Sequence, residues 1–228
     1  MKYTDFELNS QRKAVYFLME TLKDHLINMI KSNDYNYIYV GKDIEGLDYV
    51  SILFGDLYFE LFSKSYNSAG AFGFRENNKY QISFAILDDS VDLSNKKQIA
   101  ELYLYLLTEH NLAVFHELIH YNDACCGLIT EDMSSKSDNM KDYINDKMEY
   151  HAYLQELLAL AEEDMLLNRW NKMNILQRLN LQNKFIENRD KERSDQKTNL
   201  YVRYFTDENY KEMIEHAKSL FASHMLDK

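Results

Sequence analysis

The stretch Phe115-His116-Glu117-Leu118-Ile119-His120-Tyr121 contains two histidines four residues apart, with a glutamate directly after the first. On an α-helix, residues four apart lie on one face, so His116 and His120 would point the same way. Two imidazoles in that arrangement can bind one Zn²⁺ ion at about 2.0–2.1 Å each. Glu117 lies about 100° around the helix from His116, a position suited to a general base beside the metal. The pattern therefore predicts a helix that carries a zinc site.

The length and composition of the chain are typical of a folded protein, and its charge disfavours polyanionic partners such as nucleic acid. The 228 residues can bury a sizeable core, and 46% hydrophobic with 28% charged residues is typical of a globular protein. The formal net charge of −11 disfavours binding to nucleic acid and docking on anionic membranes. We therefore expect neither nucleic acid nor a membrane as a partner.

The cysteines and the N-terminus bear on the compartment. The two cysteines, Cys125 and Cys126, are adjacent, and adjacent cysteines rarely form a disulfide with each other. The first ten residues lack an apolar signal core, and no uncharged apolar run is long enough to span a bilayer. We expect a cytoplasmic protein.

The distribution of helix-breaking residues divides the chain into two halves. Proline is absent, and all six glycines lie within the first 127 residues. This asymmetry predicts an α+β fold that is mostly helical, with a small antiparallel sheet in the N-terminal half. We expect one domain over residues 1–228, with a mixed α/β lobe (1–127) that contains the motif helix and an all-helical lobe (128–228).

Hydrophobic periodicity places the remaining elements. Residues 47–66 fit either a buried helix or strands around Gly55, whereas 71–87 predict a β-hairpin with its turn at 76–79. The other expected elements are a helix over 5–32, a strand ending near 41, a helix beginning after Ser94, and helices over 138–169, 173–186 and from 207 onward.

The motif helix has plausible ends on both sides. Asn111 can cap a helix that starts at Leu112, and Gly127 can stop it in a left-handed conformation. We place the motif in the middle of a helix over about 112–126. A single continuous helix over 95–126 is the alternative reading.

A catalytic zinc ion usually has three protein ligands, so a third must come from elsewhere. Glu149 is the best candidate, because it follows His120 by 29 residues on another predicted helix, beyond a polar loop. Ala152 would lie beside it, and a small residue there would let two helices approach closely.

These residues resemble those of the gluzincin-type zinc metallopeptidases, in which a glutamate from the next helix completes the His-Glu-x-x-His site. The pairing of Ala113–His120 with Glu149-Tyr150-His151-Ala152 looks most like the compact phage-associated peptidases of the ImmA/IrrE type. The resemblance covers roughly residues 111–158 and implies a zincin-like fold. It also implies that His116, His120 and Glu149 bind Zn²⁺ and that Glu117 is the catalytic base. The chain departs from that family at Ile119, where Gly or Ala is common, and in its long helical tail.

Two other residues could supply the third ligand. His151 lies about 200° around the helix from Glu149, so only one of the two can face the metal. Cys126 has the spacing of the third ligand in metzincins, although their pattern needs a glycine where this chain has Asp123.

The sequence therefore predicts a zinc-dependent endopeptidase that hydrolyses peptide bonds in a protein or peptide substrate. Residues 80–87 could form the sheet edge that pairs with an extended substrate. The alternative is a zincin-like protein of a phage or mobile element that binds a partner without cleaving it. If the motif spacing arises by chance, the protein would retain no metal. No feature of the sequence fixes the oligomeric state.

Overall fold

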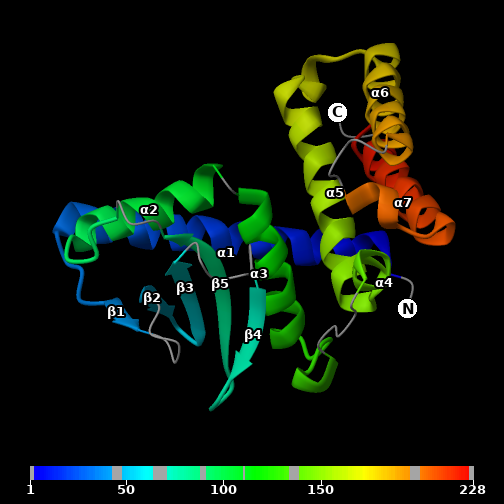
Figure 1. Ribbon diagram of the computed structural model, residues 1–228. Coiled ribbons are helices and arrows are strands. Elements are labelled where there is room, and N and C mark those ends of the chain that lie inside the picture. Colours follow the sequence, from blue (N-terminus) through cyan, green and yellow to red (C-terminus); the bar gives the residue numbers. More distant parts are fainter. Residues whose placement is uncertain are drawn as a thin grey trace. The chain divides into compact units, whose positions relative to one another are not determined.

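The computed structural model describes residues 3–42, 48–63, 71–87, 91–109, 111–133, 139–195 and 201–225. The chain forms an α+β fold that is mostly helical, with a five-stranded sheet in the N-terminal half (Figure 1). Contacts divide it into two compact units. The sheet unit comprises Lys13–Asp132, and the helical unit comprises Met1–Arg12 together with Met133–Lys228.

The sheet has the strand order β1-β2-β3-β5-β4. Its strands are β1 (Ile38–Lys42), β2 (Asp48–Phe54), β3 (Leu57–Ser63), β4 (Ala71–Arg75) and β5 (Lys79–Leu87). Three neighbouring pairs are antiparallel, as expected, but β3 and β5 run parallel, so the sheet is mixed. Because β5 pairs with both β3 and β4, the expectation of a sheet edge at 80–87 is wrong. Among the described strands, β4 forms that edge.

Residues that tolerate positive φ form two of the turns that connect strands in the described part of the sheet. Gly55, at φ +63°, lies between β2 and β3, which shows that the ambiguous segment forms strands. Asn77 and Asn78, at φ +62° and +55°, lie between β4 and β5 and confirm the predicted hairpin. Asparagine is enriched at such turns because its short polar side chain tolerates the left-handed region.

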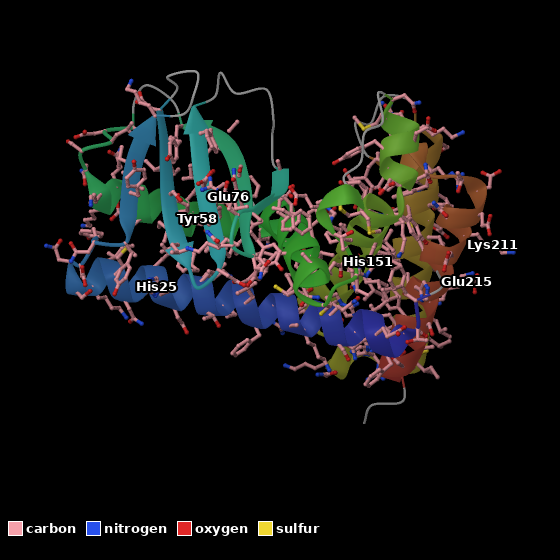
Figure 2. All side chains as sticks on the ribbon, turned by 90° about the horizontal axis from the view of Figure 1, so that it is seen from below. His25, Tyr58, Glu76, His151, Lys211 and Glu215 are labelled. Atoms are coloured by element: carbon pink, nitrogen blue, oxygen red, sulfur yellow. The ribbon has the colours of Figure 1, made fainter. Side chains whose placement is uncertain are left out.

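One face of the sheet packs against α1 (Asp5–Ser32) and α2 (Lys96–Glu109). The hydroxyl of Tyr103 on α2, which is fully buried, lies 3.0 Å from the Val50 carbonyl oxygen and 2.8 Å from that of Phe59. On α1, the His25 ring contacts Phe54 of β2 at 5.1 Å between centroids; Figure 2 labels His25 on the helix that runs along the strands. The core of the sheet unit therefore lies between this face and the two helices.

The motif lies on α3 (Asn111–Cys125), which is separate from α2. Asn111 is the first helical residue rather than a residue preceding the helix. Gly127 adopts φ +69°, and its N–H donates to the Ala124 carbonyl, while the Leu128 N–H donates to the Asp123 carbonyl. These two bonds form a Schellman motif, as the predicted stop at Gly127 requires.

The helical unit contains α4 (Met140–Asn145), α5 (Lys147–Leu167), α6 (Ile175–Ser194) and α7 (Asp207–Met225). The expected single helix over 138–169 is wrong, because Asp146 adopts ψ 143° and separates α4 from α5. The last three helices pack around a core in which Phe221 contacts Trp170 and Phe185, each at 5.6 Å between ring centroids. Leu8 of α1 belongs to the same core. Three short 3₁₀ turns complete the described elements: η1 (Glu131–Met133), η2 (Trp170–Lys172) and η3 (Tyr201–Tyr204).

None of the helices in the described ranges combines the length and the apolar composition needed to cross a membrane.

Candidate metal centre

Helix α3 buries an unusual number of polar side chains. His116, Glu117, His120 and Asp123 are 7%, 9%, 2% and 2% exposed, alongside the apolar residues that fix the helix in the core. Burying an ionisable group costs free energy unless it is hydrogen-bonded, paired or bound to a metal. A helix used only for packing would carry apolar residues at these positions.

The two histidines lie on the same face of α3, as their spacing predicts. Their ring centroids are 4.8 Å apart, with an interplanar angle of 81°. The ring of Phe72, on the edge strand β4, lies 6.1 Å from that of His120. The motif helix therefore runs beside the edge strand within the sheet unit.

Glu149 lies in the first turn of α5, where the break at Asp146 places it. The Asp146 carboxylate accepts a hydrogen bond from the Met148 N–H at 3.0 Å and caps the helix. The first turn is the positive end of the helix dipole, where a carboxylate is stabilised. Glu149 is only 3% exposed.

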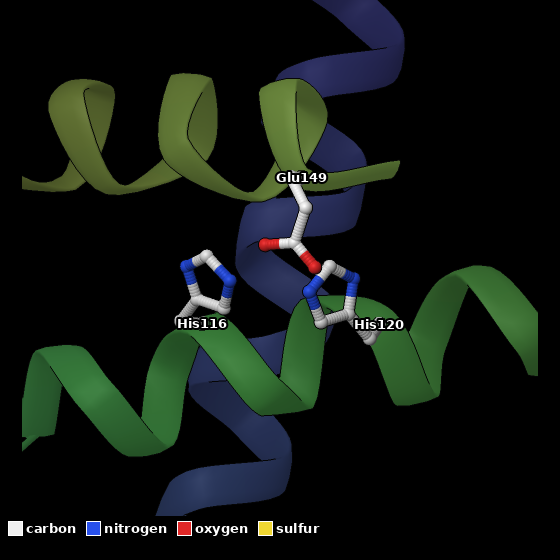
Figure 3. A group of neighbouring side chains, drawn as sticks. All are labelled: His116, His120 and Glu149. Carbon is white, nitrogen blue, oxygen red and sulfur yellow. The ribbon is translucent and has the colours of Figure 1, made fainter. Parts of the chain in front are cut away.

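His116, His120 and Glu149 form one group of potential metal ligands (Figure 3). One ligand atom from each residue lies within 4.8 Å of the others. In a tetrahedral zinc site, ligand atoms about 2.0–2.1 Å from the metal are about 3.4 Å from one another. The two imidazoles and the carboxylate are therefore a group that could hold a metal ion if their ligand atoms moved somewhat closer together.

The two rival ligands lie in other surroundings. His151 is fully buried, its ring stacks on Tyr3 at 4.2 Å between centroids, and its Nε2 lies 3.4 Å from Gln155 Nε2. Cys126 is an exposed free cysteine just beyond the end of α3. Within the described ranges, neither residue belongs to a group that could hold a metal ion.

The side chain of Tyr121, next to His120, is hydrogen-bonded to a residue outside the group of potential metal ligands. Its hydroxyl donates to the Asp56 carboxylate at 2.7 Å. Burial and this hydrogen bond raise the pKa of Tyr121 well above its usual value, so it stays protonated. Tyr150 donates to the Asn209 carbonyl at 3.3 Å within the helical unit. The hydroxyls of both tyrosines therefore already have protein acceptors.

Asp146 decides where Glu149 lies, but the sequence pattern did not predict its capping role. An aspartate three residues before a helical glutamate is a recognisable cap signal, but the surrounding residues continue the helical pattern on both sides. The missed cap therefore left Glu149 in the interior of the predicted helix instead of its first turn.

The chain matches no protein-family model and no curated protein, and no solved structure matches it.

Proposed function

We propose that this protein is a zinc-dependent metallopeptidase that acts in the cytoplasm on a protein or peptide substrate. The observation that carries the proposal is the buried group of His116, His120 and Glu149, with Glu117 on the same helix as the two histidines. Two imidazoles and one carboxylate are the ligand set of one class of catalytic zinc sites in peptidases.

In the proposed mechanism, the imidazoles of His116 and His120 and the carboxylate of Glu149 would hold the metal. When bound, zinc supplies Lewis acidity that polarises the scissile carbonyl and makes water a better nucleophile. Glu117 takes a proton from the attacking water and then delivers it to the nitrogen of the departing amine. Glu117 is buried, at 9% exposure, and directly follows His116 on the helix, which supports this role.

The position of the substrate in this proposal follows from the sheet. Among the described strands, β4 lies at the edge of the sheet and next to α3, so its outer side could pair with an extended polypeptide. Such pairing would hold the substrate beside the motif helix without strong selection of its side chains. The strand first expected to do this, 80–87, already pairs on both sides.

The test combines metal analysis with hydrolysis. We expect the purified protein to contain about one equivalent of zinc and to cleave an unfolded protein substrate such as casein. His116→Ala should lose both the metal and the cleavage. Glu117→Gln should keep the metal and lose at least about 100-fold in rate. Glu76→Gln, in the exposed hairpin turn, is the matched control and should change neither.

Each part of the proposal has its own contradictory outcome. Full hydrolysis by Glu117→Gln would exclude that residue as the base. Zinc retained by Glu149→Ala but lost from Cys126→Ser would transfer the third ligand to the cysteine. Stoichiometric zinc in a protein that cleaves no tested polypeptide would favour the non-cleaving binding protein, and absence of metal would refute both functions.

A further inference from the structure

Aliphatic side chains gather on the surface of the helical unit where α5 ends and α6 begins. Leu166, Leu167, Ile175, Leu176 and Leu179 are 78%, 70%, 65%, 69% and 40% exposed. In the described part of the chain, the only other exposed leucine or isoleucine is Leu53, at 37%. Exposed large apolar residues are usually scattered singly over a protein surface. A cluster of them marks a surface that contacts a partner or a membrane.

The same region has a charge opposite to that of the rest of the protein. We call residues 165–186 the α5–α6 corner; they include Arg169, Lys172, Arg178 and Lys184 and no acidic residue. The remainder of the chain holds 22 of the 26 basic residues and all 37 acidic residues, so its formal charge is −15. The corner is thus a basic, apolar segment in a strongly acidic protein.

The fold holds the leucines outward because other residues of the corner fill the core. Trp170 is 5% exposed, and its indole N–H donates to the His224 carbonyl at 3.0 Å. The Arg178 guanidinium lies over the Trp170 ring, 5.2 Å from its centroid, and donates to the Met225 carbonyl at 3.2 Å. A capping box between Asn174 and Gln177 fixes the first turn of α6. The exposed apolar residues therefore project from a well-anchored scaffold.

We propose that the α5–α6 corner docks on the surface of an anionic lipid bilayer. Figure 1 shows α5 and α6 meeting at one end of the helical unit. Leu166, Arg169 and Lys172 of the corner also line a hollow in the surface there. Exposed aliphatic side chains flanked by cations suit shallow insertion among anionic lipid headgroups. The exposed Arg169 and Lys172 would contact lipid phosphates while the leucines enter the boundary of the acyl chains.

The acidic residues nearest the corner limit how deeply it can enter. Glu162, Glu163 and Asp164 precede it on α5, and Glu162 is paired with Arg12 at 2.7 Å. The geometry therefore points to shallow, interfacial binding. The net charge of −11 is a property of the whole protein and not of the corner. Surface charges farther than about 8 Å from the lipid are screened at physiological salt, so the acidic remainder of the protein does not prevent the corner from binding.

The experiment uses the full chain and vesicles of phosphatidylcholine with or without phosphatidylglycerol. We expect co-sedimentation with the phosphatidylglycerol vesicles alone, weakening as salt is raised. The single tryptophan, Trp170, lies in the corner, so brominated acyl chains should quench its fluorescence on binding. The double variant Leu166→Ser, Leu176→Ser should lose at least about tenfold in partitioning and most of the quenching.

Matched variants separate the corner from the rest of the surface. Arg169→Gln with Lys172→Gln should reduce partitioning by about tenfold or more, because each cation near an anionic surface contributes to binding. Lys191→Gln with Lys211→Gln makes the same charge change elsewhere on the helical unit and should have little effect; Figure 2 labels Lys211 on α7.

Three results would overturn the proposal. The first is failure of the wild-type protein to bind phosphatidylglycerol vesicles. The second is binding that the control pair weakens as much as the corner pair does. The third is self-association in place of vesicle binding, abolished by the leucine variant, because the corner would then be a protein interface.

Discussion

Replacing Arg75 by methionine should destabilise the protein in a way that depends on pH. Arg75 Nη2 lies 2.6 Å from Glu60 Oε1; the Glu60 side chain is 1% exposed and the Arg75 side chain 38%. Loss of a partner from a fully buried ion pair costs about 3–5 kcal/mol. Because Arg75 is partly solvated and its charge is screened, we expect a smaller loss, about 1–3 kcal/mol, near pH 7.

The direction of the pH dependence follows from Glu60. Burial raises the pKa of this carboxyl group above its usual value of 4.5, and the Arg75 charge opposes that effect. The folded protein therefore favours the protonated form of Glu60. The resulting contribution to the free energy of unfolding is fully present below pH 4.5 and is lost as pH rises through the folded-state pKa. Arg75→Met removes the opposing charge, raises the folded pKa further and should cost most near neutral pH.

Urea denaturation near pH 7 and near pH 4.5 measures the effect for the wild type, Arg75→Met, Glu60→Gln and the double variant. The cost of Arg75→Met should shrink at the lower pH and in the Glu60→Gln background. Lys97→Met, which breaks an exposed pair with Glu101 at 3.7 Å, is the control and should cost little at either pH. An Arg75→Met cost that is equal at both pH values and in both backgrounds would refute the electrostatic reasoning.

Three further predictions address the turn after the motif helix, the core and the metal. Gly127→Ala should cost about 1 kcal/mol or more in unfolding free energy, because φ is +69° there, whereas Gly73→Ala, with open space around its Cβ and no positive φ, should cost less. Tyr103→Phe should cost about 1–2 kcal/mol by removing the buried hydroxyl bonded to strand carbonyls, and an unchanged urea midpoint would contradict this. Zinc at 100 times its dissociation constant should stabilise the wild type by about 2.7 kcal/mol in thermal melts, but should not stabilise His120→Ala.

The sequence was most informative where the relevant signals are local. The positive-φ residues Gly55, Asn77 and Gly127 all form turns or helix ends, because glycine and asparagine tolerate that backbone region. Helix α1 and the β4–β5 hairpin occur where periodicity predicted them. The same local information failed at Asp146, where one capping side chain interrupts an otherwise continuous helical pattern.

Sheet topology was not available from local signals. The β4–β5 hairpin is fixed by its own turn, but its placement beside β3 depends on the long-range parallel pairing of β5 with β3. That placement puts β5 between two neighbouring strands and leaves β4 at the edge of the described sheet. The identity of the edge strand, which the proposed substrate binding requires, is therefore a tertiary property.

The sequence alone determined that His116 and His120 share one face of a helix, since the helical repeat fixes the directions of residues four apart. It also named Glu149 as the best third ligand. Only the tertiary structure decided that residues 1–12 group with the C-terminal helices, that Glu149 lies in the first turn of a helix, and that its carboxylate belongs to a group with both imidazoles. These outcomes depend on the packing of distant segments, which no local pattern encodes.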